Sequence, residues 1–243
     1  MMKEFKSIMI NGKPIQEGYA TNHWFNDRTI VRNKNVLLVV VGATGSGKSY
    51  SCLRMAECWY QSHFNEKFPQ ENICFSLGDS AKIIMKDNHR KGEIIIVEEA
   101  GVLINSLSFQ NKLQKLFVAI LQSVRVKNSV FIFNLPQLSM LNKSARSLAH
   151  GIFLTQEIDM ANKQTILKPF YAQTNAISGK LYNKYLRQKI QNRFVKIERV
   201  RFNDLLKEHT GLDYETSSEN DFEKKIDELG IKIEKSVEKS GYA

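Results

Sequence analysis

The amino-acid sequence predicts an α/β fold in which a mainly parallel sheet is flanked by helices, and three observations support this. Runs rich in apolar residues at Val36–Val41, Glu93–Val97 and Ser129–Phe133 indicate strands that are buried on both faces, as a parallel sheet requires. Segments with apolar residues at helical spacing lie between these runs. A glycine-rich segment, Gly42–Gly47, joins the first run to one of the helices.

The other elements follow from the same patterns, in chain order. The sequence predicts helices over residues 48–63, 80–88, 109–126 and 138–149, and further strands over 73–77, 151–155 and 165–172. We expect the last two strands to lie side by side, and Trp24 and Phe25 to pack at the edge of the core. Helices that alternate with strands are typical of an α/β fold. We therefore expect an N-terminal segment over 1–35, a core over 36–178 and a C-terminal extension over 179–243.

The C-terminal extension differs from the core in its charge. Its first part, to about Gly211, reads as a helical and basic segment. Between Gly179 and Phe202 only Glu198 opposes eight basic residues: Lys180, Lys184, Arg187, Lys189, Arg193, Lys196, Arg199 and Arg201. Tyr182, Tyr185 and Phe194 are interleaved with these charges. The balance turns acidic after Asn203, and apolar spacings of three and four over 222–237 predict an amphipathic helix.

The composition limits the partners and the compartment. The chain has 243 residues, a formal charge of +10 and a pI of about 9.4, which suggests a polyanionic partner. Its three cysteines form no C-x-x-C pair, so we expect neither a disulfide framework nor a zinc site. The N-terminus lacks a signal-peptide pattern and no apolar run is long enough to span a bilayer, so we expect a cytoplasmic protein without a membrane span.

The glycine-rich segment matches the phosphate-binding pattern G-x-x-x-x-G-K-[ST]. We expect the nucleotide to be bound by Gly42, Ala43, Thr44, Gly45, Ser46, Gly47, Lys48, Ser49 and the adjoining Tyr50. Glycines let successive backbone N–H groups turn towards phosphates, and the following helix adds its positive N-terminal end. Lys48 is expected to reach the β- and γ-phosphates, and the Ser49 hydroxyl to bind Mg²⁺. The position between a buried strand and a helix is the context that this motif requires.

Two carboxylates follow the second apolar run, in the sequence Glu93-Ile-Ile-Ile-Val-Glu98-Glu99. The carboxyl end of a parallel strand lies at the sheet edge where ligands bind, so these acids are expected beside the phosphate loop. Glu98 is assigned to the metal and Glu99 to polarising the attacking water. Neighbouring residues on a strand point to opposite sides, so the two acids are not expected to share a role.

A polar residue just beyond the third apolar run is a candidate sensor of the γ-phosphate. Gln137 is the first choice and Asn134 the second. Arg125, which precedes that run, is a candidate to stabilise phosphate charge in a neighbouring subunit.

Together these features resemble the HerA/FtsK-type branch of RecA-like ATPases, which includes DNA pumps of cell division, conjugation and viral genome packaging. In that branch an apolar strand ends in two acids, a helix leads to an arginine, and a glutamine follows the next strand. The corresponding segments here read IIIVEE, LQSVR, VFIF and NLPQ, with Pro136 where the family usually has Thr. Over about residues 35–156 the chain looks closest to small ATPases of archaeal viruses and mobile elements, and Zot-type assembly ATPases of phages are further relatives.

The resemblance implies a function and an assembly. It implies Mg²⁺-dependent ATP hydrolysis with the roles given above for Lys48, Ser49, Glu98, Glu99 and Gln137, and with Arg125 acting between subunits. It also implies a homo-oligomeric ring, commonly a hexamer. The leading hypothesis is a DNA translocase that contacts DNA through Lys180–Arg201. The alternatives are an assembly or secretion ATPase that acts on protein, a nucleotide-gated switch, and a small-molecule kinase in which His89-Arg90-Lys91 would form the lid.

Overall fold

The structure is a computed structural model that describes residues 9–10, 13–14, 17–75, 77–84, 89–98, 127–141, 143–190 and 193–203. All of them belong to one compact unit, Met1–Leu205. The helices predicted over 109–126 and 222–237 lie outside the described residues, as does the rest of the acidic tail. No helix in the described part of the chain is long and apolar enough to cross a bilayer.

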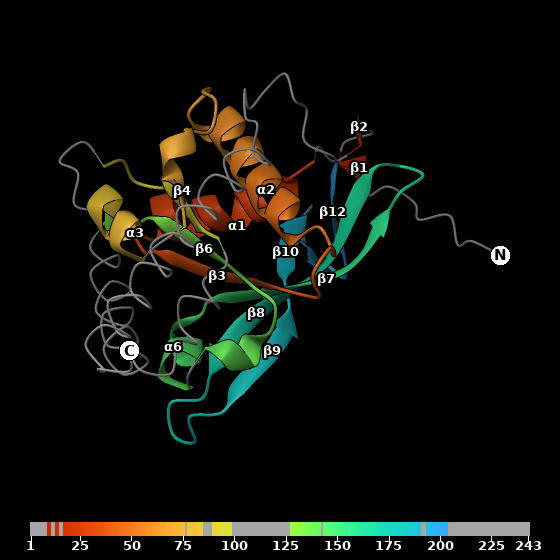
Figure 1. Ribbon diagram of the computed structural model, residues 1–243. Coiled ribbons are helices and arrows are strands. Elements are labelled where there is room, and N and C mark those ends of the chain that lie inside the picture. The colour runs from red at the N-terminus through yellow and green to blue at the C-terminus, as the bar shows by residue number, and fades with distance from the viewer. Residues whose placement is uncertain are drawn as a thin grey trace, which may run out of the picture. The chain divides into compact units, whose positions relative to one another are not determined.

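An eight-stranded sheet forms the centre of the fold (Figure 1). Its parallel part is ordered β7 (Gly151–Asp159), β3 (Val36–Val41), β6 (Val130–Leu135), β5 (Ile94–Val97) and β4 (Ile73–Cys74). Three antiparallel strands extend it beyond β7: β8 (Gln164–Thr174) pairs with β7, and both β12 (Val200–Asn203) and β9 (Leu181–Tyr185) pair with β8. Every residue of β3, β5 and β6 is buried, which explains why these strands are apolar except for Asn134 of β6.

Helices cover both faces of this sheet (Figure 1). The described helices are α1 (Tyr19–Asn26, continued by a π-helical turn over Asp27–Val31), α2 (Lys48–His63), α3 (Leu77–Ile84) and α6 (Lys143–Leu148), with 3₁₀ turns at Gln70–Asn72 and Leu138–Met140. One cluster of the core joins β3, β5 and β6 to Leu141, Ala145 and Ala149 near α6. On the other face Trp24 of α1 stacks on Phe153 of β7 at 6.0 Å between ring centroids. The predicted mixed α/β fold, a mainly parallel sheet flanked by helices, is confirmed.

The predicted elements and the observed ones agree best where the sequence is most strongly patterned. The strand Val36–Val41 and the helix Lys48–His63 have the predicted bounds. The strand predicted over 165–172 does lie beside that predicted over 151–155, as β8 and β7, and both strands are longer than expected. In contrast, β4 contains only Ile73–Cys74, because α3 already begins at Leu77 rather than at residue 80.

The basic segment between Gly179 and Phe202 is not helical, and that prediction is wrong. It forms β9, β12 and a separate hairpin of β10 (Arg187–Ile190) and β11 (Arg193–Lys196). In β12 the buried Val200 and Phe202 alternate with the exposed Arg201 and Asn203, which is the period of a strand with one buried face. The even distribution of charge along the segment obscured this alternation.

The N-terminal aromatic pair and two of the three cysteines are buried in the core. Trp24 and Phe25 are buried, with exposed fractions of 7% and 0%. All three cysteines are free thiols; Cys52 and Cys74 are buried. Burial raises the pKa of the partly buried Cys58 thiol to about 12, so this side chain stays protonated at neutral pH. The cysteines thus behave as small apolar residues of the core.

Candidate nucleotide-binding site

Three neighbouring parallel strands end together beside the segment Gly42–Ser49. In the register of the sheet, Val41 of β3 lies opposite Leu135 of β6, and Val97 of β5 lies opposite Phe133. The chain therefore leaves β3 into the glycine-rich loop at the level where β6 carries Asn134 and β5 leads into Glu98. The carboxyl edge of the sheet brings these three segments to one place, as expected for a ligand site in an open α/β sheet.

The backbone of the loop has the form of a phosphate cradle. Gly45 and Gly47 have φ angles of 74° and 79°, a left-handed conformation that favours glycine. Gly47 is the N-cap of α2, and its carbonyl accepts the hydrogen bond from the Ser51 N–H at 2.9 Å. The first turn of α2, which includes Tyr50, therefore directs its N–H groups and positive helix end towards the space enclosed by the loop.

Two threonines of the β7–β8 pair hold the loop from the side. Thr155 of β7 donates to the carbonyl of Val41 at 3.1 Å, and its Oγ1 lies 2.7 Å from Ser46 Oγ. Thr165 of β8 lies 2.7 Å from Ser51 Oγ, just below the loop. A Cβ atom on Gly42 would overlap Thr155 Oγ1, and one on Gly47 would overlap Thr165 Cγ2. The two glycines are thus required by close packing against β7 and β8.

Lys48 lies across the mouth of the loop. Its Nζ donates to the carbonyl of Ala43 at 2.8 Å, in an exposed position. The ammonium group is therefore held over the cradle, where it can interact with the terminal phosphates of a bound nucleotide.

A buried polar cluster connects the loop to the neighbouring strands. Ser49 donates to Glu98 Oε2 at 2.9 Å, and the Asn134 amide donates to the same carboxylate oxygen at 2.6 Å and to Ser49 Oγ at 2.9 Å. Glu98 is 1% exposed and Asn134 is 4% exposed. The Glu98 backbone N–H donates to the carbonyl of Cys74 at 2.9 Å, which fixes the start of the turn after β5.

The cluster fits a divalent cation of the Mg²⁺ class. Such ions prefer hard oxygen ligands, and the Ser49 hydroxyl and Glu98 carboxylate supply two that lie 2.9 Å apart. Asn134 Oδ1 is also buried, and among the described residues it accepts no hydrogen bond. Buried polar oxygens without partners are uncommon in folded proteins and indicate a site where a ligand or water completes the contacts.

The other predicted site residues lie elsewhere or outside the described residues. Gln137 is exposed in the connection after β6, and its amide oxygen accepts a hydrogen bond from Ser139 at 3.2 Å. Asn134, the second choice for a polar residue near the phosphates, is the one that contacts Ser49 and Glu98. Glu99 and Arg125 lie outside the described residues, so their roles and that of Gln137 stay predictions.

The segment His89-Arg90-Lys91 lies at the opposite edge of the sheet, because it precedes β5 whereas Glu98 follows it. His89 lies 2.6 Å from Ser129 Oγ, and Arg90 pairs with Glu66 at 2.9 Å. These contacts tie the segment to the amino ends of the strands. It therefore does not cover the phosphate loop, and the lid suggested by its basic sequence is not formed.

Sequence reasoning missed the supporting role of the two threonines. Thr155 follows the apolar residues Ile152-Phe153-Leu154 and is itself buried, and a buried hydroxyl usually has a specific hydrogen-bond partner. Nothing in the sequence links Thr165 to Ser51, which is 114 residues distant along the chain.

Replacement of Asn134 by leucine is expected to lower Mg²⁺-dependent nucleotide hydrolysis by about 10- to 100-fold, the usual effect of removing a residue that orients metal ligands. Leucine has a similar volume but donates neither of the hydrogen bonds to Ser49 and Glu98. In a Mg²⁺ titration, the variant should reach half of its maximal rate at a higher Mg²⁺ concentration than the wild type. Gln61→Leu, which removes an exposed amide of α2 outside the site, is the matched amide control. An unchanged Mg²⁺ requirement in Asn134→Leu would contradict the role of this amide.

Comparisons with known proteins give likenesses in structure only. No protein-family model matches the sequence, and no curated protein matches it. The N-terminal domain of zonular occludens toxin from Neisseria meningitidis is 15% identical, with 67% of this chain and 100% of that one covered at a TM-score of 0.38. A KaiC-like protein from Pyrococcus horikoshii is 11% identical, with 68% and 90% covered at a TM-score of 0.41.

A third similar structure is the genome packaging NTPase of Sulfolobus turreted icosahedral virus 2 in complex with AMP. It is 12% identical, and 61% of this chain and 96% of that one are covered at a TM-score of 0.33. At such low identities and TM-scores the likenesses carry no assignment of activity, which is argued below from the residues of the site.

Proposed function

We propose that this protein is a Mg²⁺-dependent ATPase that works as a ring-forming, DNA-translocating motor of the genome-packaging or DNA-transfer type. The observation that carries the ATPase part is the convergence of Ser49, Glu98 and Asn134 beside a complete phosphate loop. A loop that only held a phosphate would not need a buried carboxylate at hydrogen-bond distance from its serine. The arrangement supports a site for a nucleotide and its metal.

Each residue of the cluster has a distinct task in this proposal. The loop N–H groups and the N-terminus of α2 bind the phosphates, and Lys48 neutralises charge on the terminal ones. Ser49 and Glu98 would hold Mg²⁺, which supplies positive charge to the β- and γ-phosphates when bound. Asn134 orients both ligands through its two donated hydrogen bonds. Thr155 and Thr165 keep the loop in its receptive shape.

The remaining roles in the proposal rest on the sequence. Glu99 would accept a proton from the attacking water, Gln137 would sense the γ-phosphate, and Arg125 of one subunit would stabilise charge in the next. Mixed rings test the last role: an Arg125→Ala subunit should regain activity beside wild-type neighbours. If the inactive subunits are not rescued by mixing, Arg125 does not act between subunits.

Phosphate release from ATP tests the proposed activity. We expect release that requires Mg²⁺ and stops on addition of a chelator. Thin-layer separation of γ-labelled products distinguishes free phosphate from a labelled metabolite, which a kinase would give. A labelled metabolite, or no release at any metal concentration, would contradict the proposal. The kinase alternative lacks support from His89-Arg90-Lys91, since this segment lies at the opposite edge of the sheet from the phosphate loop.

A basic cleft beside α1 supports nucleic acid as the substrate of the motor. It has a volume of about 680 Å³ and contains five basic side chains, Arg28, Arg32, Lys184, Arg187 and Lys196, and one acidic side chain, Asp27. Tyr171 and Tyr185 also line the cleft, and Lys196 Nζ lies 4.2 Å from the centre of the Tyr185 ring. Cations next to aromatic rings suit a phosphate backbone with its bases.

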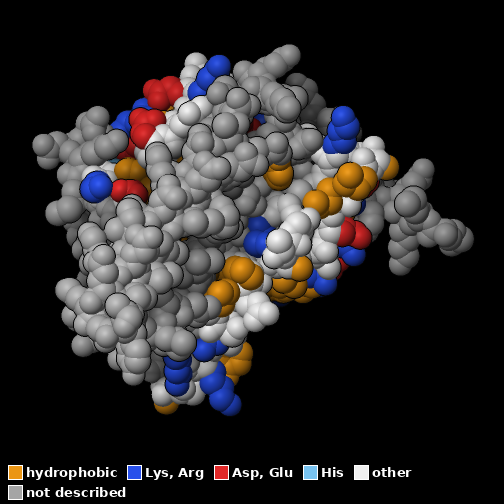
Figure 2. All heavy atoms as spheres, in the orientation of Figure 1, with side chains coloured by type: hydrophobic (Ala, Val, Ile, Leu, Met, Phe, Trp, Pro, Cys, Tyr) orange, Lys and Arg blue, Asp and Glu red, His pale blue; other side chains and the backbone are white. Residues whose placement is uncertain are grey.

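Part of the predicted basic segment lines this cleft. Lys184, Arg187 and Lys196 come from β9, β10 and β11, although the segment was expected to be helical. Further Lys and Arg side chains gather at the lower end of the face in Figure 2, near the connection between β8 and β9. Burial lowers the pKa of Arg28, but this guanidinium stays charged at neutral pH.

DNA binding tests the motor part of the proposal separately from ATP hydrolysis. We expect DNA to stimulate ATP hydrolysis and to bind with an affinity that falls steeply between low and moderate salt, because phosphate contacts release counterions. Arg187→Gln should lower the affinity and reduce the salt slope. Electron microscopy with ATP and DNA should show rings. Phosphate release without any DNA binding would favour an ATPase that acts on protein.

A further inference from the structure

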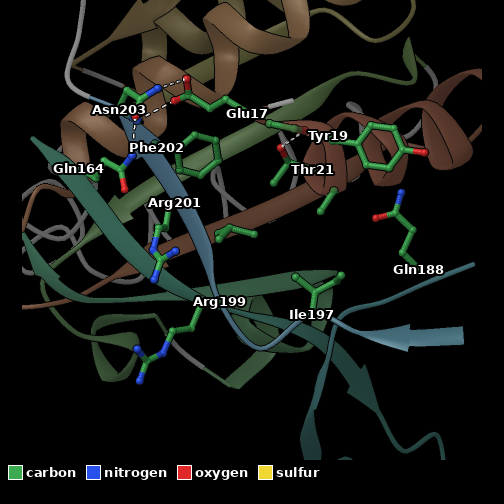
Figure 3. Close-up of a pocket in the computed structure, with 13 residues that line it drawn as sticks. Glu17, Tyr19, Thr21, Gln164, Gln188, Ile197, Arg199, Arg201, Phe202 and Asn203 are labelled. Carbon is green, nitrogen blue, oxygen red and sulfur yellow. Dashed lines mark hydrogen bonds between the residues drawn. The ribbon is translucent and has the colours of Figure 1, made fainter. Parts of the chain in front are cut away.

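A second pocket lies between the start of α1, the end of β12 and strand β10, and has a volume of about 420 Å³ (Figure 3). It is lined by residues 17–21, Gln164, Gln188, Ile197 and residues 199–203. None of the residues from Gly42 to Tyr50 is among them, so this pocket is separate from the phosphate loop. It is also distinct from the basic cleft, with which it shares no lining residue.

The most unusual lining residue is Gln188 of β10. Its side chain is 4% exposed, yet neither Oε1 nor Nε2 has a hydrogen-bond partner within the described part of the chain. In Figure 3 the amide points from β10 towards Tyr19 of α1. Burial of an amide without partners costs free energy, so folded proteins rarely retain one. The amide is therefore placed to meet a ligand that supplies both an acceptor and a donor.

The walls of the pocket are apolar and aromatic. Ile197 and Phe202 are buried, with exposed fractions of 7% and 0%, and the Tyr19 ring forms the opposite side. The exposed Arg199 and Arg201 also line the pocket, but in Figure 3 their guanidinium groups point away from Gln188. The pocket therefore combines apolar walls with one donor–acceptor edge.

The acidic residue of the pocket does not oppose an anionic ligand strongly, because its charge is already balanced. Both carboxylate oxygens of Glu17 accept hydrogen bonds from Arg54, at 3.1 and 3.0 Å. The backbone and side-chain N–H groups of Asn203 donate to the same carboxylate at 2.6 and 2.7 Å. Glu17 thus fixes the upper end of the pocket and leaves the Gln188 amide as the group that a ligand would meet.

We propose that this pocket binds one unpaired nucleobase of a single-stranded nucleic acid. The inference rests on the proposed function, which it deepens by naming the form of the nucleic acid. The Watson–Crick edge of every base carries a donor next to an acceptor, which complements the two atoms of a glutamine amide. In a duplex this edge is already paired inside the stack, so only an unpaired base can bring it into a pocket.

The basic cleft is lined by parts of the same two segments as the pocket. Helix α1 contributes Tyr19 to the pocket and Trp24 to the cleft, and the π-helical turn that continues it contributes Arg28 to the cleft. Strand β10 contributes Gln188 to the pocket and the adjacent Arg187 to the cleft, because neighbouring strand residues point to opposite sides. A nucleic-acid strand whose phosphates lie in the cleft would have to pass around β10 to place a base in the pocket; a cationic groove together with a site for bases is typical of proteins that bind single strands.

Gln188→Leu tests the proposal, because leucine keeps the bulk of the side chain and removes both polar atoms. Fluorescence anisotropy would measure binding of a labelled single strand of about 20 nucleotides, which exceeds one typical site, and of the same sequence as a duplex, both without ATP. We expect the wild-type protein to prefer the single strand. Gln188→Leu should weaken single-strand binding about 10-fold and leave duplex binding unchanged. Gln61→Leu, on the exposed side of α2, is the matched control.

Thermal unfolding of the same variants separates a ligand-binding amide from a structural one. The Tm of Gln188→Leu should equal or exceed that of the wild type, because an unpartnered buried amide is replaced by an apolar group. A lower Tm together with weaker binding of both nucleic acids would show a structural role and overturn the proposal. Unchanged single-strand binding would overturn the base pocket and leave the proposed motor intact. If the wild type bound neither nucleic acid, the proposed DNA function itself would fail.

Discussion

Lys48→Ala is expected to lower ATP hydrolysis by at least about 100-fold, the usual cost of removing a charged group that stabilises the transition state. The Lys48 ammonium lies over the phosphate loop, where it donates to the carbonyl of Ala43 at 2.8 Å. Alanine removes the only side-chain cation of the segment from Gly42 to Tyr50. Phosphate release at saturating Mg²⁺ and ATP binding by a fluorescent analogue would measure the effect.

The fold of this variant should be preserved, because the lost contact is exposed. Ala43 lies at the surface, so water can replace the ammonium as the donor to its carbonyl. The Tm should therefore stay close to that of the wild type while the activity is lost. Lys67→Ala, which removes an exposed lysine beyond the far end of α2, is the matched control and should leave both properties unchanged. Hydrolysis within about twofold of the wild type in Lys48→Ala would refute the assignment of the site, since that is far from the expected loss.

The sequence predicted the parts of the site that depend on local pattern. The strand Val36–Val41, the loop and the helix Lys48–His63 follow one another directly, so the glycine spacing and the apolar run were sufficient to place them. Glu98 was also predicted, because an acid that follows a buried strand emerges at the same edge of the sheet. These features need no information about distant parts of the chain.

Features that depend on long-range packing were not predictable in the same way. Asn134 and Gln137 both follow an apolar run, and only the register of β6 against β3 and β5 brings Asn134 to Ser49. The β7–β8 pair contacts the loop across more than a hundred positions of the chain, and no local pattern records such a contact. The basic strands have no clear alternation of apolar and charged residues, so their charge pattern does not distinguish them from a helix, although their aromatic residues favour a sheet.

Gly42→Ala is expected to disrupt the phosphate loop and to abolish nucleotide binding. A Cβ atom at this position would overlap Thr155 Oγ1 and lie 2.9 Å from Ser46 Oγ. Overpacking of this kind costs about 1–3 kcal/mol, and relief requires the loop to move away from β7. Binding of an ATP analogue and thermal unfolding would show a loss of affinity together with a lower Tm.

A second substitution in β7 should partly restore the loop. Thr155→Ala removes the overlapping hydroxyl, but the Cβ atoms of residues 42 and 155 would still be only 3.1 Å apart, so the rescue is incomplete. Thr155→Ala alone should cost about 1 kcal/mol, because the hydrogen bonds with Ser46 and Val41 are lost. A double-mutant cycle should therefore give a coupling energy that favours the double variant.

Gly45→Ala distinguishes steric overlap from backbone strain. Nothing lies within 4 Å of a Cβ atom at this position, although its φ of +74° disfavours alanine by about 1–2 kcal/mol. Its defect should therefore not be relieved by Thr155→Ala. Equal rescue of Gly42→Ala and Gly45→Ala would mean that Thr155 acts on the flexibility of the whole loop. Rescue of Gly42→Ala alone would show that β7 sets the shape of the phosphate cradle through direct contact, and that the antiparallel β7–β8 pair is part of the nucleotide site.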